Sequence, residues 1–176
     1  DRGLRALPDI LWRKASNRAT KFMGSGMLPP NAYPTLEHEH VLVFRNGQRH
    51  QFPPGDDDRY ESAYFWEERN EWFSDLWHLA GETQAVEDGL RERSGAFPLE
   101  LPYRLISMFS AYGDTVFDPF LGTGTTTVAA MAAGRNSVGY DRDDDLLSAL
   151  DQRVDAAPQR SREIAEQRLA DHREWV

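Results

Sequence analysis

Two acidic residues and two glycines stand at spacings that suit a ligand containing a ribose. Asp118 ends a short apolar run, and Gly122 and Gly124 follow it. Asp141 ends the next apolar run. Glycines have no side chain, so the backbone can turn tightly there and come close to a ligand. Asp141 lies roughly 20 residues beyond Gly122, the spacing at which an acid reaches a ribose diol. These residues therefore indicate a nucleotide-binding type of site.

The elements that must position these residues are a strand, a helix and a second strand. Residues 115–118 form a short apolar run that predicts a strand. A helix is expected from about Thr125 to Gly134, where glycine suits a left-handed cap. Residues 136–140 predict the next strand. The order is that of a βαβ unit, in which the helix presents its free N–H groups to the loop.

Three ligands compete for such a loop. A Gly-Lys-Ser/Thr phosphate loop is excluded, because Gly124 is followed by Thr125-Thr126. A dinucleotide fingerprint is disfavoured, because Thr127 stands where a third glycine is needed. S-adenosyl-L-methionine has a ribose and no phosphate, and Asp118 would suit an acceptor near its amino-acid end. The loop alone leaves two interpretations open, this cofactor and a turn whose glycines serve packing only.

The first half of the chain predicts strands separated by a long connection. Residues 10–12 and 40–44 are apolar, β-favouring runs, and the second ends at an Asn46-Gly47 turn signal. Residues 13–36 are rich in Gly, Ser, Asn and Pro, which predicts a long loop.

An aromatic stretch and two helices complete the expected elements. The stretch is expected to cover the edge of a core, in preference to stacking on bases, and it contains Phe65, Trp66, Trp72, Phe73, Leu76 and Trp77. Residues 81–95 are a polar connection, and Phe97-Pro98 is expected to open a helix, because proline suits the first helical position. A charged helical tail is expected beyond Pro158.

Composition restricts the class of protein. The 176 residues suffice for a domain with a proper core, and no window is apolar enough to span a bilayer. The absence of cysteine excludes disulfides and thiolate metal sites and suits a cytoplasmic location. The net charge is −9, and 18 of the 20 basic residues are arginine. An acidic surface in a salt-loving host and a GC-rich genome explain this equally well.

Two further candidate sites, a histidine pair and a single glutamate, are better explained by structural roles. His38 and His40 share one face of an expected strand, but no third metal ligand is evident, so strand packing is preferred to a metal site. Glu100 could mimic a general acid, but a cap or a salt bridge is the preferred interpretation.

The stretch AFPLELPYRLISMFSAYGDTVFDPFLGTGTTTVAA resembles the cofactor half of the DNA methyltransferases that modify cytosine N4 or adenine N6. In the circularly permuted β-class of that family, an F-P-x-E-L helix leads directly into D-P-F-x-G-x-G-T. The matching residues are Phe97, Pro98, Glu100, Leu101, Asp118, Pro119, Phe120, Gly122, Gly124 and Thr125. The earlier stretches ILWRKASN and EHEHVLVFRNG resemble the sheet-edge strands of the same family, so the resemblance covers residues 9–145.

The resemblance implies an α/β, Rossmann-like fold for S-adenosylmethionine-dependent methyltransferases, with a seven-stranded doubly wound sheet and one antiparallel hairpin strand. It implies that Asp141 takes the ribose hydroxyls. It also implies that the methionine end is held by Phe97, Pro98, Asp118, Pro119, Phe120, Gly122, Thr123, Gly124 and Thr125.

The catalytic segment of the family, Asp/Ser/Asn-Pro-Pro-Tyr/Phe/Trp, has no match in this sequence. Pro29-Pro30 is flanked by Leu28 and Asn31, and Pro53-Pro54 by Phe52 and Gly55. In the β-class the segment precedes the strands with which this sequence opens. The chain is therefore expected to be an incomplete fold, the carboxy-terminal part of an enzyme whose catalytic strands lie upstream.

Three regions are expected from these motifs. Residues 1–96 would hold hairpin strands, a DNA-facing loop and the aromatic segment, residues 97–157 the cofactor-binding βαβ region, and residues 158–176 the helical tail.

The expected function is methyl transfer from S-adenosyl-L-methionine to a base in double-stranded DNA, with cytosine N4 favoured over adenine N6. A cognate restriction endonuclease is a further expected partner. Four basic residues stand in a stretch without acids between Asp9 and Glu37: Arg13, Lys14, Arg18 and Lys21. By themselves they favour a solvated loop, whereas with the resemblance they suggest contacts with DNA phosphates. Trp12 is also expected to bind DNA. The alternative is a non-catalytic DNA- or cofactor-binding remnant.

Overall fold

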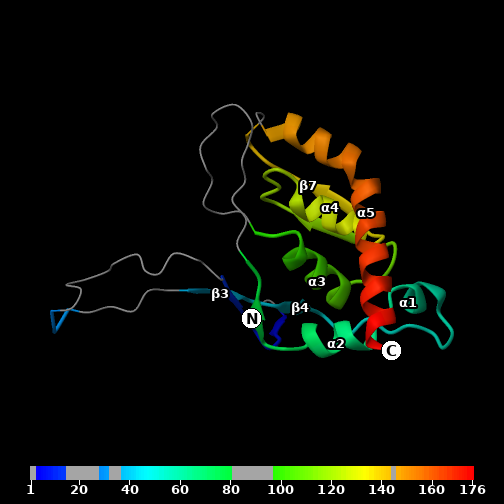
Figure 1. Cartoon of the computed structure of the whole chain (residues 1–176), viewed down its shortest axis with the longest axis horizontal. Coiled ribbons are helices and arrows are strands. Elements are labelled where there is room, and N and C mark those ends of the chain that lie inside the picture. The colour runs from blue at the N-terminus through cyan, green and yellow to red at the C-terminus, as the bar shows by residue number, and fades with distance from the viewer. Residues whose placement is uncertain (1–2, 15–27, 32–36, 81–96, 144–145) are drawn as a thin grey trace. The chain divides into compact units, whose positions relative to one another are not determined.

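The structure, a computed structural model, divides into two compact units (Figure 1). It describes residues 3–14, 28–31, 37–80, 97–143 and 146–176, without the side chains of residues 147 and 148. The first unit contains residues 1–49 and 74–82, and the second contains residues 50–73 and 83–176. These limits differ from the three expected regions, because the aromatic segment is shared between the units. The connections expected in residues 15–27, 32–36 and 81–96 lie outside the described residues.

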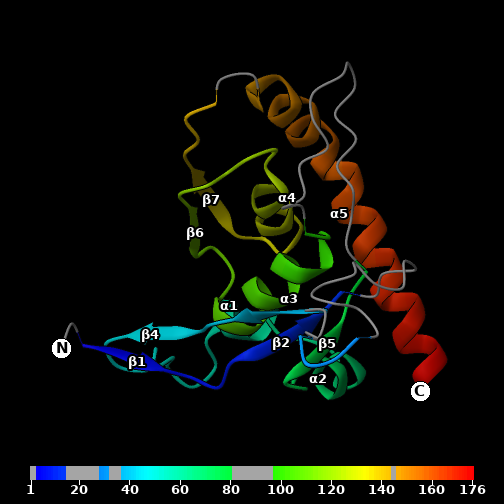
Figure 2. The ribbon, with the colours of Figure 1, turned by 90° about the vertical axis from the view of Figure 1, so that its left-hand side faces the viewer.

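The described residues of the first unit form five strands. β1 (Leu4–Ala6) and β4 (Phe44–Asn46) form an antiparallel ribbon. β2 (Ile10–Arg13) lies between β3 (His38–Val41), which is antiparallel to it, and β5 (Leu76–His78), which is parallel. Figure 2 shows the ribbon extending away from this three-stranded sheet. The strand expected over residues 40–44 is wrong in its limits, because the run pairs with β2 at its start and with β1 beyond residue 43.

Alternation along β2 determines the core of the first unit. Ile10 and Trp12 point to the buried face, as the two-residue period of a strand requires. Trp12 lies opposite Trp77 of β5 in the parallel register, and its indole N–H donates to the Leu79 carbonyl at 3.0 Å. Trp12 and Trp77 are therefore interior residues of this unit.

The second unit combines a two-stranded parallel sheet with helices. The expected strand over residues 115–118 is confirmed as β6, and the next is confirmed as β7 with its end at residue 139. The helix expected between residues 125 and 134 is also confirmed, and Gly134 adopts φ 73° after it. The elements are α1 (Asp57–Glu61), α2 (Trp66–Trp72), α3 (Glu100–Phe109), β6 (Thr115–Asp118), α4 (Thr125–Ala132), β7 (Asn136–Gly139) and α5 (Leu147–Trp175).

Two helix limits differ from the sequence prediction. α3 begins at Glu100, and Pro98 precedes it with its carbonyl accepting the Leu101 N–H at 3.1 Å. α5 begins at residue 147 and contains Pro158, whereas the helical tail was expected beyond that residue. Proline removes one helical hydrogen bond, but the packing of α5 against α4 and α2 extends along both sides of it and maintains one helix.

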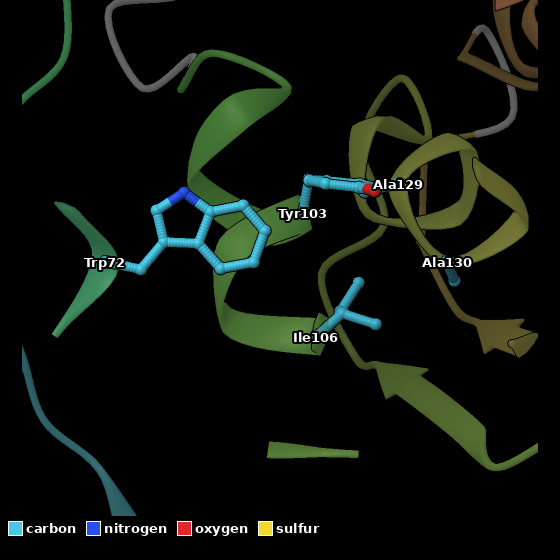
Figure 3. Close-up of a cluster of buried hydrophobic side chains, with 5 residues drawn as sticks. All are labelled: Trp72, Tyr103, Ile106, Ala129 and Ala130. Carbon is cyan, nitrogen blue, oxygen red and sulfur yellow. The ribbon is translucent and has the colours of Figure 1, made fainter. Parts of the chain in front are cut away.

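The core of the second unit joins three helices. Trp72 of α2, Tyr103 and Ile106 of α3, and Ala129 and Ala130 of α4 form one buried cluster (Figure 3). The two rings meet edge to face with centroids 6.1 Å apart, a favoured geometry for aromatic pairs. The small side chains of α4 leave room for the larger ones of α3. The expectation that aromatic residues cover a core is thus confirmed for Trp72.

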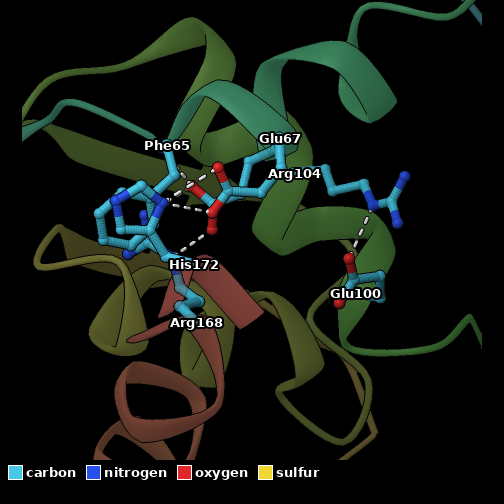
Figure 4. Close-up of polar contacts among 7 residues, drawn as sticks. Phe65, Glu67, Glu100, Arg104, Arg168 and His172 are labelled. Atoms are coloured by element: carbon cyan, nitrogen blue, oxygen red, sulfur yellow. Dashed lines mark hydrogen bonds and ion pairs between the residues drawn. The ribbon is translucent and has the colours of Figure 1, made fainter. Parts of the chain in front are cut away.

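Polar contacts fasten the end of α5 to α2 (Figure 4). Arg168 donates to both carboxylate oxygens of Glu68, and this hydrogen bonding raises the pKa of the guanidinium. His172 Nδ1 lies 2.9 Å from Glu67 Oε1, and its ring stacks on Phe65 with centroids 4.2 Å apart. Glu68 Oε2 also accepts the Phe65 N–H at 2.8 Å, so it caps α2 as well.

We predict that Glu68→Ala lowers the free energy of unfolding by about 2–4 kcal/mol, because it removes the cap and leaves Arg168 without its partner. The two side chains are only 29% and 11% exposed, so solvent screens their interaction weakly. Glu68→Gln retains an acceptor for the cap and should lose less. Denaturant unfolding measures both.

The matched control is Glu163→Ala on the same chain. Glu163 pairs with Arg160 at 3.0 Å on the exposed side of α5, and a surface pair of this kind contributes little to stability because solvent screens it. Equal losses for Glu68→Ala and Glu163→Ala would contradict the assigned role of Glu68.

Candidate functional site

The parallel pairing of β6 and β7 brings the two predicted acids to one edge. Asp118 is opposite Gly139 in the register, and the pairing continues as the Tyr140 N–H donates to the Asp118 carbonyl at 2.9 Å. The Leu121 N–H then donates to the Tyr140 carbonyl at 2.9 Å. Because both strands end at the same edge, the loop after β6 and the acid after β7 become neighbours.

The Asp141 carboxylate holds the glycine loop. Its Oδ2 accepts the Gly122 N–H at 2.7 Å, and its Oδ1 accepts the Asp143 N–H at 3.0 Å. Asp118 closes the start of the loop, because its Oδ1 accepts the Phe120 N–H at 2.9 Å. Gly122 and Gly124 adopt φ angles of 56° and 80°, values that side-chain-bearing residues rarely adopt. The predicted acids therefore shape the loop between them.

A cavity of about 560 Å³ lies beside this loop. Its size is within the range of small-molecule sites, and it is lined by Pro119, Phe120, Tyr140, Asp141 and Arg142. Three of these were predicted from the sequence. Tyr140 and Arg142 were not predicted as site residues, and the only signal for them was their position on either side of Asp141 at the end of a strand.

The remaining predicted cofactor residues are not among those that line this cavity. Thr123 and Thr125 are buried, and Thr125 Oγ1 accepts a hydrogen bond from Arg153 of α5 at 3.0 Å. Phe97 is half-buried and Pro98 is buried, and neither is among the lining residues.

Gly124 has a packing role that the sequence did not reveal. A Cβ at this position would lie 2.3 Å from Leu150 Cδ1 on α5, so a neighbouring helix occupies the space beside it. At Gly122 a Cβ would meet only the Phe120 carbonyl, at 3.9 Å. Of the two loop glycines, Gly122 is thus the one with open space beside the backbone.

The predicted DNA-binding residues differ in accessibility. Trp12 is 3% exposed, and its interior position corrects the expectation that it contacts DNA. Arg13 Nη2 pairs with Glu37 Oε2 at 3.0 Å, and Lys14 pairs with Glu39. The absence of acids nearby in sequence was misleading, because the neighbouring strand β3 and the residue before it supply them. Arg18 and Lys21 lie outside the described residues.

The histidine pair and Glu100 have polar partners. His40 Nδ1 lies 3.0 Å from Asp9 Oδ2, and the His38 and His40 rings meet edge to face. Among the described residues, no group of three or more His, Cys, Asp or Glu side chains is placed to hold a metal ion. Glu100 pairs with Arg104 Nε at 2.7 Å, which confirms its expected salt bridge.

A comparison with protein families decides the assignment. The model of the DNA methylase family matches residues 1–152. This chain belongs to the DNA methylase family. The resemblance drawn from its sequence motifs is thereby confirmed at the level of the family.

Curated relatives and a solved structure agree with this assignment. The DNA methylase chain is 53% identical over 180 residues to the Type II methyltransferase M.MthZI of Methanothermobacter thermautotrophicus, which covers 100% of this chain and 51% of the relative. It is 50% identical over 152 residues to M.MjaI of Methanocaldococcus jannaschii, covering 86% of this chain and 50% of the relative. The chain spans about half the length of these relatives.

The crystal structure of TTHA0409 from Thermus thermophilus, whose name assigns it to the DNA modification methylases, was obtained with S-adenosyl-L-methionine. It matches with a TM-score of 0.69 and 29% identity, over 88% of this chain and 55% of that one. The expected α/β class of methyltransferase fold is confirmed. Within the described parts of this DNA methylase chain, no helix combines the length and apolar character needed to cross a bilayer.

We predict that Gly124→Ala destabilises the protein in the absence of any ligand for two reasons. The left-handed backbone costs about 1–2 kcal/mol for a residue with a side chain, and the new Cβ must also displace Leu150. Adding Leu150→Ala to this variant should remove the cost of displacing Leu150 and leave the backbone cost unchanged. Thermal unfolding of the single and double variants measures the difference.

Gly122→Ala provides the comparison, since its backbone is also left-handed but its side is open. It should show the conformational loss alone and no coupling to Leu150→Ala. Equal coupling at both glycines would contradict the packing role of Gly124.

Proposed function

We propose that this chain is the cofactor-binding part of a Type II DNA methyltransferase. The complete enzyme transfers a methyl group from S-adenosyl-L-methionine to an exocyclic amino group in double-stranded DNA, with cytosine N4 favoured and adenine N6 the other target. The observation that carries the proposal is the cavity at the ends of β6 and β7, with Asp141 in its lining and the glycine loop bonded to that acid.

The chemistry of the residues present fits this cofactor. Carboxylate oxygens accept hydrogen bonds from hydroxyl groups, and Asp141 lines the cavity, so it would accept the ribose hydroxyls there. The loop lacks the lysine of a phosphate site, which agrees with a ligand that has no phosphate. When bound, S-adenosyl-L-methionine supplies an electrophilic methyl group.

The other residues proposed for the methionine end surround Asp118. Its carboxylate would accept from the cofactor's amino group, and the backbone at Gly122 would approach the ligand. The full proposed set is Phe97, Pro98, Asp118, Pro119, Phe120, Gly122, Thr123, Gly124 and Thr125, of which Gly124 and Thr125 would act by shaping the loop against α5.

The exposed face of β6 and β7 is evidence that a further polypeptide covers it in the complete enzyme. Phe117 and Tyr140 lie 5.8 Å apart on an exposed face, and Phe120 is 86% exposed. Parallel sheets normally have both faces covered, and within the described residues no strand pairs with the outer edge of either strand. We propose that the covering polypeptide also carries the catalytic Asp/Ser/Asn-Pro-Pro-Tyr/Phe/Trp segment, whose strand precedes these residues in the family's order.

DNA would be contacted by the first unit. Arg13 and Lys14 form exposed pairs that contribute at most about 1 kcal/mol, so a phosphate can replace Glu37 and Glu39 as their partner. Arg18 and Lys21 remain proposed contacts on the sequence alone. A cognate endonuclease and a cytoplasmic location belong to the same proposal.

A non-catalytic remnant is the second candidate. Its distinguishing feature would be the lack of an Asp/Ser/Asn-Pro-Pro-Tyr/Phe/Trp segment anywhere in the full-length protein. Such a remnant would bind cofactor or DNA and transfer nothing.

We predict that Asp141→Ala weakens S-adenosyl-L-methionine binding by roughly 1.5–3 kcal/mol, the scale of lost hydrogen bonds to a charged group. Titration calorimetry on the full-length protein measures it. Asp155→Ala removes an equivalent charge from the exposed side of α5 and should leave the affinity unchanged. Equal affinities for wild type and Asp141→Ala would refute the ribose assignment.

We also predict that residues 1–176 alone transfer no methyl group and are marginally stable, because strand edges and apolar surface in the described part of the chain have no partner there. Adding the family's catalytic segment, in the same chain or as a separate one, should raise the unfolding temperature and produce labelled methyl transfer to DNA. Transfer by residues 1–176 alone would show that an acceptor site exists elsewhere. Failure of the added segment to restore transfer, with stability restored, would favour the remnant.

A further inference from the structure

The two arginines of the β1–β4 ribbon face each other. Arg5 and Arg45 are direct partners in the antiparallel register, so their side chains leave the same face of the ribbon. Partners of this kind have Cβ atoms about 4.5–5.5 Å apart, and like charges placed so are unfavourable. Arg5 is exposed and Arg45 is half-buried. The ribbon thus holds two positive charges together.

No described acid neutralises this pair. Neither arginine forms an ion pair with a residue that the structure describes, and Arg45 Nε is buried with no hydrogen-bond partner there. The other basic residues at the edge of this unit differ, since Arg13 and Lys14 each have a glutamate at or beside β3. An unsatisfied donor and two adjacent cations are both unfavourable for the ribbon by itself. A bound anion would compensate for the two adjacent cations, which Arg5 presents at the surface and Arg45 through the exposed part of its guanidinium group.

The charge distribution identifies the anion. The first unit carries 8 basic and 6 acidic residues, a formal charge of +2, whereas the second carries 12 basic and 23 acidic residues, or −11. A large polyanion would therefore approach the first unit and be repelled by the second. Guanidinium groups present forked donors that match phosphate oxygens.

We propose that Arg5 and Arg45 form a clamp for the phosphodiester backbone of DNA, a site additional to the Arg13–Lys14 region. The inference rests on the proposed action on DNA. Phosphate contacts fix the position of a protein on the duplex and carry no sequence information. The clamp therefore contributes affinity and register, and base choice lies elsewhere.

The test is the salt dependence of DNA binding by the full-length protein that carries this chain. Arg5→Ala/Arg45→Ala should reduce the slope of log K against log salt by about two units, one for each lost contact. The loss should be equal for cognate and non-cognate duplexes. Arg173→Ala, which removes an exposed arginine of α5, should leave the slope unchanged. An unchanged slope in the double variant, or an equal fall in the control, would overturn the clamp.

A charge reversal separates binding from folding. Arg45→Glu creates a cross-strand ion pair with Arg5, so the unfolding temperature should be maintained or raised while DNA affinity falls. Undiminished DNA affinity in Arg45→Glu would overturn the proposal. Titration of the same samples with S-adenosyl-L-methionine distinguishes failure of the clamp from failure of the proposed function. Normal cofactor binding with an unchanged salt slope rejects the clamp alone, and failure of the wild type to bind either ligand rejects the proposed function.

Discussion

The hydrogen bond from the Gly122 N–H to the Asp141 carboxylate joins two strand ends that are 19 residues apart in sequence. It can form only because β6 and β7 pair in one parallel register, with Asp118 opposite Gly139. A slip of either strand by one residue would turn that strand's side chains to the opposite face. If β7 slipped, Ser137 would lose its contact with Thr127 of α4, and if β6 slipped, Phe117 would leave the exposed face. The loop, the acid and the cavity all depend on this register.

The sequence predicted the elements whose signals are local. The limits of β6 agree with the prediction, and β7 differs by one residue at its end, because each strand is a short apolar run bounded by turns. Gly134 was predicted as a left-handed cap and has φ 73°. The positions of Asp118 and Asp141 at one edge also followed from the sequence, since the ends of parallel strands meet there. Local chemistry was sufficient for this part of the site.

Features that depend on distant partners could not be predicted. The continuation of α5 through Pro158 depends on contacts with α2, about 100 residues earlier in the chain. The packing of Leu150 beside Gly124 and the burial of Trp12 against the strand at residue 77 are similar cases. The acids beside Arg13 and Lys14 come from β3 and the residue before it, and these residues are distant from both bases in the sequence. In each case tertiary packing decided what the local pattern left open.

The acidic composition has a structural explanation in part. Carboxylates of the second unit have defined partners, since Asp56 caps α1, Glu67 contacts His172 and Glu68 holds Arg168. These pairs allow one long charged helix to pack on α2 although it has few apolar side chains. The acidic excess is concentrated in the second unit, which also contains the cavity beside the glycine loop. A net charge of −9 would argue against a partner as negative as DNA if it were uniform. Because local potential and not net charge guides a polyanion, a chain can be acidic overall and still present a basic unit to DNA.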